Sequence, residues 1–98
     1  MEKKTPHCPL PKVKALIIAG KIRVTASAVI GAEMLGMDRA AIVSIVNSLT
    51  MQDFYKSMTT HADHSIWQDV YHPVTQAGDV YLKLTVVEDV LVVSFKEL

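Results

Sequence analysis

The sequence predicts an α+β fold, with N-terminal helices packed on a C-terminal antiparallel sheet. Up to residue 49 the apolar residues recur at helical spacing, and after that point the period shifts toward two, which is typical of strands. All six aromatic residues fall in the second half of the chain, between Phe54 and Phe95. A block of helices followed by a block of strands favours α+β over an alternating α/β arrangement. With 98 residues, the chain is expected to form one domain, 1–98.

The first expected helix covers residues 12–19. Val13, Leu16 and Ile17 lie at positions i, i+3 and i+4, so they share one apolar face. Two prolines just ahead of this segment are compatible with a helix start, and Gly20 is a natural stop.

Two further helices are expected at 26–35 and 39–49. Thr25 can cap the first of these and Gly36 would end it, while Asp38 can cap the second. The second carries an apolar stripe made of Ile42, Ile45, Val46 and Leu49. We interpret such stripes as core-facing surfaces.

The expected strands follow residue 49. Segment 53–59 has two interpretations, because Thr50 and Asp53 could form a capping box that opens a short helix. The residues from Phe54 onward alternate in character, however, and this alternation favours a strand. Further strands are expected at 64–72 and 79–96, with a loop at 73–78 between them.

The last hairpin yields the most specific structural prediction. A tight turn centred on Glu88 and Asp89 brings the apolar positions of both strands to the core side. The same register places Tyr81 directly opposite Lys96 on the other face, with Cβ atoms about 4.5–5.5 Å apart. This pair could hold an anion, although a solvated face with an extended lysine is the alternative. The expected core pairs are Leu82 with Phe95, Leu84 with Val93, and Val86 with Leu91.

The chain has no net charge, but its charges are unevenly distributed. Residues 1–23 carry six lysines and arginines against one acid, whereas residues 24–98 carry four against nine. A basic end can attract phosphates, or it can be an ordinary solvated helix face. No apolar run is long enough to cross a membrane, and the lone Cys8 cannot form an internal disulfide. The charged start has no apolar stretch behind it, so we expect no secretory signal. We therefore expect a cytoplasmic protein with no membrane partner.

Several classes of catalytic site are disfavoured by missing motifs. The sequence has no G-x-S-x-G nucleophile motif and no glycine-rich phosphate loop. His61, Asp63 and His64 suggest a metal site, but zinc needs three or four ligands and no closing pair is suitably spaced, so we favour a polar turn and expect no metal. RNA cleavage remains possible, because the 2′-hydroxyl of the substrate attacks the phosphate and the protein supplies only proton transfer and cations.

Four stretches of the second half are long enough to compare with known families. They are Asp53-Phe54-Tyr55-Lys56-Ser57-Met58-Thr59-Thr60, Ile66-Trp67-Gln68-Asp69-Val70-Tyr71, Val80-Tyr81-Leu82-Lys83 and Val93-Ser94-Phe95-Lys96-Glu97. Together with the opening Met1-Glu2-Lys3, they resemble the MqsR (motility quorum-sensing regulator) toxin family. The similarity runs along the whole chain and is strongest over 53–97.

This resemblance implies a RelE-like fold, akin to small microbial ribonucleases. It also implies the toxin of a type II toxin–antitoxin system, which cleaves messenger RNA at GC-containing, GCU-like sites without the ribosome, a metal or a cofactor, and so arrests translation and growth. The implied partner is a zinc-containing, DNA-binding antitoxin of the MqsA type, through which the toxin would contact operator DNA only indirectly.

The resemblance also implies site residues. Those implied in catalysis are Lys56, Gln68, Tyr81 and Lys96, and those implied in RNA binding are Tyr55, Met58, His72 and His7. We expect the two lysines to stabilise the phosphate, the tyrosine to donate a hydrogen bond to it, and the glutamine to position the substrate. The loop at 73–78 leaves open whether Gln68 shares a face with Tyr81.

Position 72 departs from the family pattern. We expect an arginine there, but the chain has His72. An arginine would be a permanent bidentate phosphate clamp, whereas a histidine is mostly neutral near pH 7 and can exchange protons. This departure favours an alternative function, a catalytically weak module that acts through antitoxin binding and transcriptional regulation. The complete set of catalytic candidates counts against that alternative.

Overall fold

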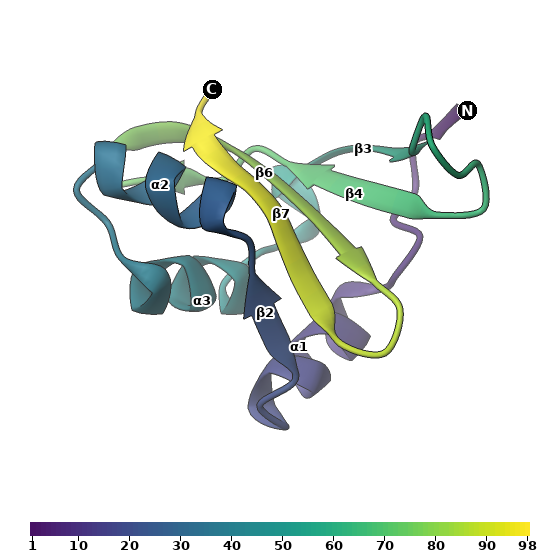
Figure 1. Cartoon of the computed structure of the whole chain (residues 1–98), viewed down its shortest axis with the longest axis horizontal. Coiled ribbons are helices and arrows are strands. Elements are labelled where there is room, and N and C mark those ends of the chain that lie inside the picture. The colour runs from purple at the N-terminus through teal and green to yellow at the C-terminus, as the bar shows by residue number, and fades with distance from the viewer.

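The computed structural model describes residues 1–98 and contains three α-helices and one sheet (Figure 1). The helices are α1 (Leu10–Ile18), α2 (Ala26–Met34) and α3 (Arg39–Asn47), and a short 3-10 turn spans Met51–Asp53. The strands are β1 (Glu2–Lys3), β2 (Ile22–Val24), β3 (Phe54–Thr59), β4 (Trp67–Tyr71), β5 (Val74–Thr75), β6 (Gly78–Val86) and β7 (Val90–Glu97). The α+β class is confirmed. All three helices fall short of the length and apolarity that a membrane span requires.

The sheet has the strand order β1-β3-β4-β6-β7-β2, and β5 pairs with β6. Its central neighbours are antiparallel, but β2 is parallel to β7. The expectation of a purely C-terminal, antiparallel sheet was therefore wrong at both edges, where β1 and β2 come from the N-terminal half. Each has only two or three residues and pairs with a strand distant in sequence, so no local alternation marks it.

Helices α2 and α3 begin where the sequence indicates. The side chain of Thr25 accepts a hydrogen bond from the amide of Ala28 at 3.1 Å, and Asp38 caps α3 in the same way at 2.9 Å. Helix α1 starts earlier than expected, at Leu10, because proline is tolerated in a first turn. Two glycines with positive φ follow α1 and α2, at Gly20 and Gly36.

The structure contains both features that the sequence suggested for segment 53–59, the capping interaction and the strand. Asp53 Oδ2 accepts a hydrogen bond from the amide of Thr50 at 2.9 Å and closes the 3-10 turn, and β3 begins immediately afterwards at Phe54. The favoured strand is thus confirmed, with the capping interaction just ahead of it. Strand β4 is shorter than the expected 64–72, and the expected loop at 73–78 contains β5.

The predicted hairpin register holds in one half and fails in the other. Tyr81 lies opposite Lys96, as expected, and Leu82 opposite Phe95. Beyond Lys83 the register shifts, so that Leu84 pairs with Val92 and Val86 with Val90, and the expected pairs with Val93 and Leu91 are wrong. The physical reason is a β-bulge, which adds one residue to β7 and lets both Val92 and Phe95 face the core.

The helices pack against one face of the sheet. The largest fully buried side chains in the core between them are, from the strands, Tyr71, Phe95, Leu82, Leu84, Val80, Val90 and Val92, and, from the helical half, Ile42, Leu49, Val13 and Val46. Along β6 the buried residues are every second one, so the residues between them lie on the opposite face. We call that opposite face the polar face; it carries Lys56, Met58, Gln68, Tyr81, Lys83 and Lys96.

Helix α2 supports the strand that carries Lys96. It lies so close to β7 that a Cβ atom on Gly31 would be 1.9 Å from the carbonyl oxygen of Phe95. Only glycine allows this approach of helix to strand backbone. The arrangement in Figure 1, with α2 alongside the last part of β7, shows the same contact between elements.

Candidate functional site

The strand registers place all four catalytic candidates on the polar face. Lys56 of β3 pairs with Val70 of β4, and Val70 pairs with Lys83 of β6, so these three share a face. Gln68 and Tyr81 each lie two residues from a member of this row, and side chains two apart along a strand point the same way. Gln68 and Tyr81 therefore share a face, which the sequence had left open. Lys96 joins them because it lies opposite Tyr81.

A β-bulge in β3 puts two neighbouring residues on the polar face. The register of β3 against β4 shifts between Phe54 and Lys56, so Tyr55 is the extra residue. Phe54 points to the core, where its ring meets the edge of Tyr71 with centroids 5.4 Å apart. Bulges re-aim side chains in this way, and here the result is that Tyr55 and Lys56 stand side by side.

Three rings and a lysine form a continuous row across the polar face. The ring of Tyr55 stacks on that of His72 at 4.4 Å between centroids, and the ring of His72 lies 5.9 Å from that of Tyr81. Nζ of Lys96 lies 5.2 Å from the Tyr81 centroid, and Nζ of Lys56 lies 5.5 Å from the Tyr55 centroid. We call Tyr55, His72, Tyr81 and Lys96 the aromatic row. It runs between two cations, so it can hold an extended anion.

Electrostatics keep protons on two of these side chains. The carboxylate of Glu2, from β1, contacts Nζ of Lys56, and this contact raises the pKa of Lys56 and lowers that of Glu2. Burial raises the pKa of Tyr81, although the nearby Lys56 acts in the opposite direction. Near neutral pH, Lys56 is therefore a cation and Tyr81 a hydrogen-bond donor, as a site for a phosphate requires.

The RNA-binding candidates divide between two places. Met58 lies opposite Gln68 on the polar face, beside the aromatic row. His7 lies apart from them: its ring stacks on Trp67 at 5.6 Å, and Nζ of Lys3 lies 4.1 Å from the Trp67 centroid. Lys3 is the strand partner of Ser57, whose side chain is fully buried. Lys3 and His7 therefore lie on the side of the sheet opposite to the polar face. The structure thus brings seven of the eight candidates together and separates His7.

A buried carboxylate anchors the N-terminal segment that carries Glu2. Asp69, only 2% exposed, accepts hydrogen bonds from the amides of His7 at 3.0 Å and Cys8 at 3.1 Å. Its third donor is Oγ of Ser57 at 2.6 Å. These bonds hold the segment against the sheet and so place β1 at the edge of the site.

Sequence analysis missed two charged residues of the polar face. Lys83 pairs with Ser94, and its position two residues after Tyr81 on the same strand was the signal that could have identified it. Glu2 had no local signal, because its contact with Lys56 depends on pairing between β1 and a strand far along the chain.

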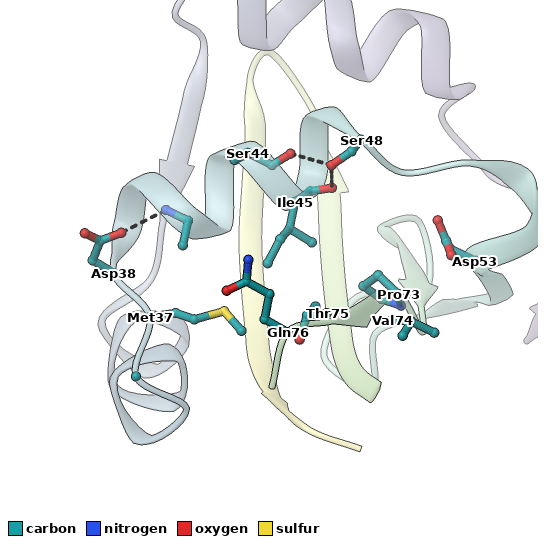
Figure 2. Close-up of a pocket in the computed structure, with 12 residues that line it drawn as sticks. Met37, Asp38, Ser44, Ile45, Ser48, Asp53, Pro73, Val74, Thr75 and Gln76 are labelled. Atoms are coloured by element: carbon teal, nitrogen blue, oxygen red, sulfur yellow. Dashed lines mark hydrogen bonds between the residues drawn. The ribbon is translucent and has the colours of Figure 1, made fainter. Parts of the chain in front are cut away.

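A cavity lies away from the polar face. It measures about 700 Å³ and separates α3 from the segment that includes β5, as Figure 2 shows. Its lining includes Met37, Asp38, Ile45 and Val74, and none of the eight site candidates belongs to it. The cavity reaches Asp53, whose carbonyl accepts a hydrogen bond from the amide of His72 at 2.7 Å.

Comparisons with known proteins agree on one family. Residues 5–97 match the family described as "Motility quorum-sensing regulator, toxin of MqsA". The chain is 55% identical to "mRNA interferase toxin MqsR" of Escherichia coli (strain K12) over 97 residues, which cover 99% of each protein. The family match includes β3, β4, β6 and β7, the strands that carry the four catalytic candidates. The chain therefore belongs to the motility quorum-sensing regulator toxin family.

Proposed function

We propose that this chain is an mRNA interferase toxin, a metal-independent endoribonuclease formed by the single domain 1–98. The observation that carries the proposal is the joint presence of Lys56, Lys96 and Tyr81 on one face, in a chain closely related to a protein named for this activity. In this mechanism the 2′-hydroxyl of the RNA attacks the neighbouring phosphate, so the protein need not supply a nucleophile. DNA lacks that hydroxyl and is not a substrate.

Each catalytic candidate has a role that fits its chemistry. Lys56 and Lys96 stabilise the negative charge that develops on the phosphate, and Tyr81 donates a hydrogen bond to it. Gln68 positions the substrate from the neighbouring strand. Tyr55, Met58 and His72 contact the RNA, with the two rings offering stacking surfaces for bases. His7, on the other side of the sheet, would bind a more distant part of the RNA.

The finer aspects of the proposal follow from family membership. The toxin cleaves messenger RNA at GC-containing sites without the ribosome, belongs to a type II system and acts in the cytoplasm. Its partner is a zinc-containing, DNA-binding antitoxin, through which it reaches operator DNA. A RelE-like fold, akin to that of small microbial ribonucleases, is also part of the proposal, and the packing of helices on a largely antiparallel sheet supports it.

The test is an incubation of the purified protein with a GC-containing RNA in EDTA. The same sequence as DNA is the substrate control. Lys96→Ala is expected to lower the cleavage rate about 10²-fold, because it removes a cation from the developing charge. Lys12→Ala, which removes an exposed lysine of α1, is the matched control and should cleave normally.

Cleavage of RNA alone, with a cyclic phosphate end and dependence on Lys96, supports the proposal. Unchanged turnover by the Lys96→Ala variant contradicts the role of that residue. A folded protein that binds its antitoxin but cleaves nothing would instead support the non-catalytic module that His72 favours.

A further inference from the structure

The polar face needs a proton acceptor that its lysines and tyrosines do not provide. The pKa of Lys56 is raised by Glu2 and that of Tyr81 by burial, so both side chains keep their protons near neutral pH. Gln68 does not exchange protons at all. Two groups with suitable chemistry remain beside these residues, the carboxylate of Glu2 and the imidazole of His72.

Glu2 is the weaker of these two proton acceptors. Its carboxylate contacts Nζ of Lys56, and this contact lowers the pKa of Glu2 and occupies Oε1. It also enters the face from β1, at the edge of the sheet. His72 stands between Tyr55 and Tyr81, in the interior of the aromatic row.

The ring of His72 makes no hydrogen bond that would explain it as a structural residue. Nε2 is buried and has no hydrogen-bond partner, whereas Nδ1 is not among the buried, unpaired atoms. Buried polar atoms are nearly always paired, and an exception calls for a functional explanation. The backbone is fixed by the bond from the His72 amide to Asp53, so the ring is held in place while Nδ1 stays available.

The surroundings of His72 favour a phosphate nearby. The rings of Tyr55 of β3 and Tyr81 of β6 flank it, and the ammonium groups of Lys4, Lys56 and Lys96 lie beyond these two tyrosines. The three ammonium groups attract a phosphate to this row. Because Nε2 is buried, Nδ1 is the ring nitrogen that a substrate hydroxyl can approach.

We propose that His72 is the general base of the reaction and that its Nδ1 accepts the proton of the attacking 2′-hydroxyl. This inference rests on the proposed ribonuclease function. As the proton moves to Nδ1, the 2′-oxygen bonds to phosphorus and the bond from phosphorus to the 5′-oxygen breaks. The 5′-oxygen leaves with the electron pair and takes a proton from water. The imidazolium then returns its proton to the hydroxide, and the products are a 2′,3′-cyclic phosphate and a 5′-hydroxyl.

The test compares cleavage and binding in variants of the full chain. His72→Gln is expected to lower kcat about 10²-fold, the usual contribution of a general base, and to weaken the binding of an uncleavable 2′-O-methyl RNA by a much smaller factor, because only one stacking surface is lost. The native rate should fall on acidification, because a protonated imidazole cannot accept another proton, and the variant should lose this dependence. His64→Gln, in the exposed loop between β3 and β4, is the matched control.

Two more variants separate a base from a phosphate contact. His72→Arg should bind the uncleavable RNA at least as tightly as the native chain and still cleave slowly, because it keeps a cation but cannot accept a proton. His72→Ala should regain activity when imidazole is added. The inference is overturned if His72→Arg cleaves at the native rate, if His72→Gln loses only affinity, or if imidazole restores nothing to a folded His72→Ala protein. If the native chain cleaves no RNA, the proposed function fails first and the inference fails with it.

Discussion

Glu2 illustrates how one residue can adjust the charge of a site without taking part in chemistry. Its carboxylate occupies Nζ of Lys56, which a phosphate would otherwise contact. Glu2→Gln should therefore strengthen binding of an uncleavable RNA, by up to about five-fold because exposed ion pairs are weak. The freed lysine should also steepen the dependence of log affinity on log salt by about 0.7, the contribution of one phosphate contact on a single strand.

The sign of this effect follows from the protonation states. Glu2 raises the pKa of Lys56, so losing it moves that pKa down toward its ordinary value near 10.5, and the lysine stays charged near neutral pH. The change in RNA affinity therefore depends on the competition between Glu2 and the RNA phosphate for the ammonium group of Lys56. Fluorescence anisotropy over a salt series measures both quantities, with Glu33→Gln on the exposed side of α2 as the control. Weaker binding by Glu2→Gln would instead mean that the carboxylate orients Lys56 for the phosphate.

At the scale of elements, Asp69 of β4 connects the sheet to the N-terminal segment. Asp69→Asn replaces one acceptor oxygen with an amide that cannot accept, which leaves a buried donor of His7, Cys8 or Ser57 unpaired. We expect a loss of about 1–3 kcal/mol in the free energy of unfolding, measured by urea titration. Amide hydrogen exchange at residues 1–8 should accelerate, because β1 is released.

A smaller change provides the comparison for Asp69. Ser57→Ala removes one of three donors to the carboxylate and leaves both backbone bonds in place, so it should cost only about 1 kcal/mol. Equal losses in the two variants would contradict the view that the carboxylate anchors the segment through His7 and Cys8.

The sequence predicted elements well where local patterns specify them. The caps of Thr25 and Asp38 fixed the starts of α2 and α3. The sequence could not predict β1 and β2, because such short strands depend on distant pairing partners rather than on their own alternation. The bulge at Val93 was not predicted because residues 90–93 are all apolar, so either register of this stretch satisfies the hydrophobic pattern.

The candidate site was predictable to the extent that it depends on the final hairpin. Alternation along β6 and β7 was enough to pair Tyr81 with Lys96. Gln68 could not be assigned to a face, because the length of the loop before β6 does not determine the register of β4. The stacking of Tyr55 on His72 depends on the β3 bulge as well, and the sequence does not reveal it.

In the whole molecule, the residues that stabilise the fold and the residues that we propose to act on RNA lie on opposite faces of one sheet. Leu82 and Tyr81 are neighbours that test this separation, because the first is fully buried in the core and the second lies in the aromatic row. Leu82→Ala should lower the free energy of unfolding by about 2–5 kcal/mol and leave the kcat of the folded fraction unchanged. Tyr81→Phe should lower RNA cleavage about 10²-fold by removing a donor to the phosphate, while the melting temperature changes little.

The paired measurements are urea unfolding and single-turnover cleavage at a temperature where both variants are folded. A large loss of stability in Tyr81→Phe, or a large loss of kcat in Leu82→Ala, would mean that the two faces are coupled through the strand. The independence that we expect has a structural basis. The core face is held by helix packing and backbone strand pairing, to which the side chain of Tyr81 does not contribute, and the polar face draws its geometry from backbone registers that Leu82→Ala leaves in place. Substitutions on the polar face can therefore alter the chemistry of the site while the fold persists.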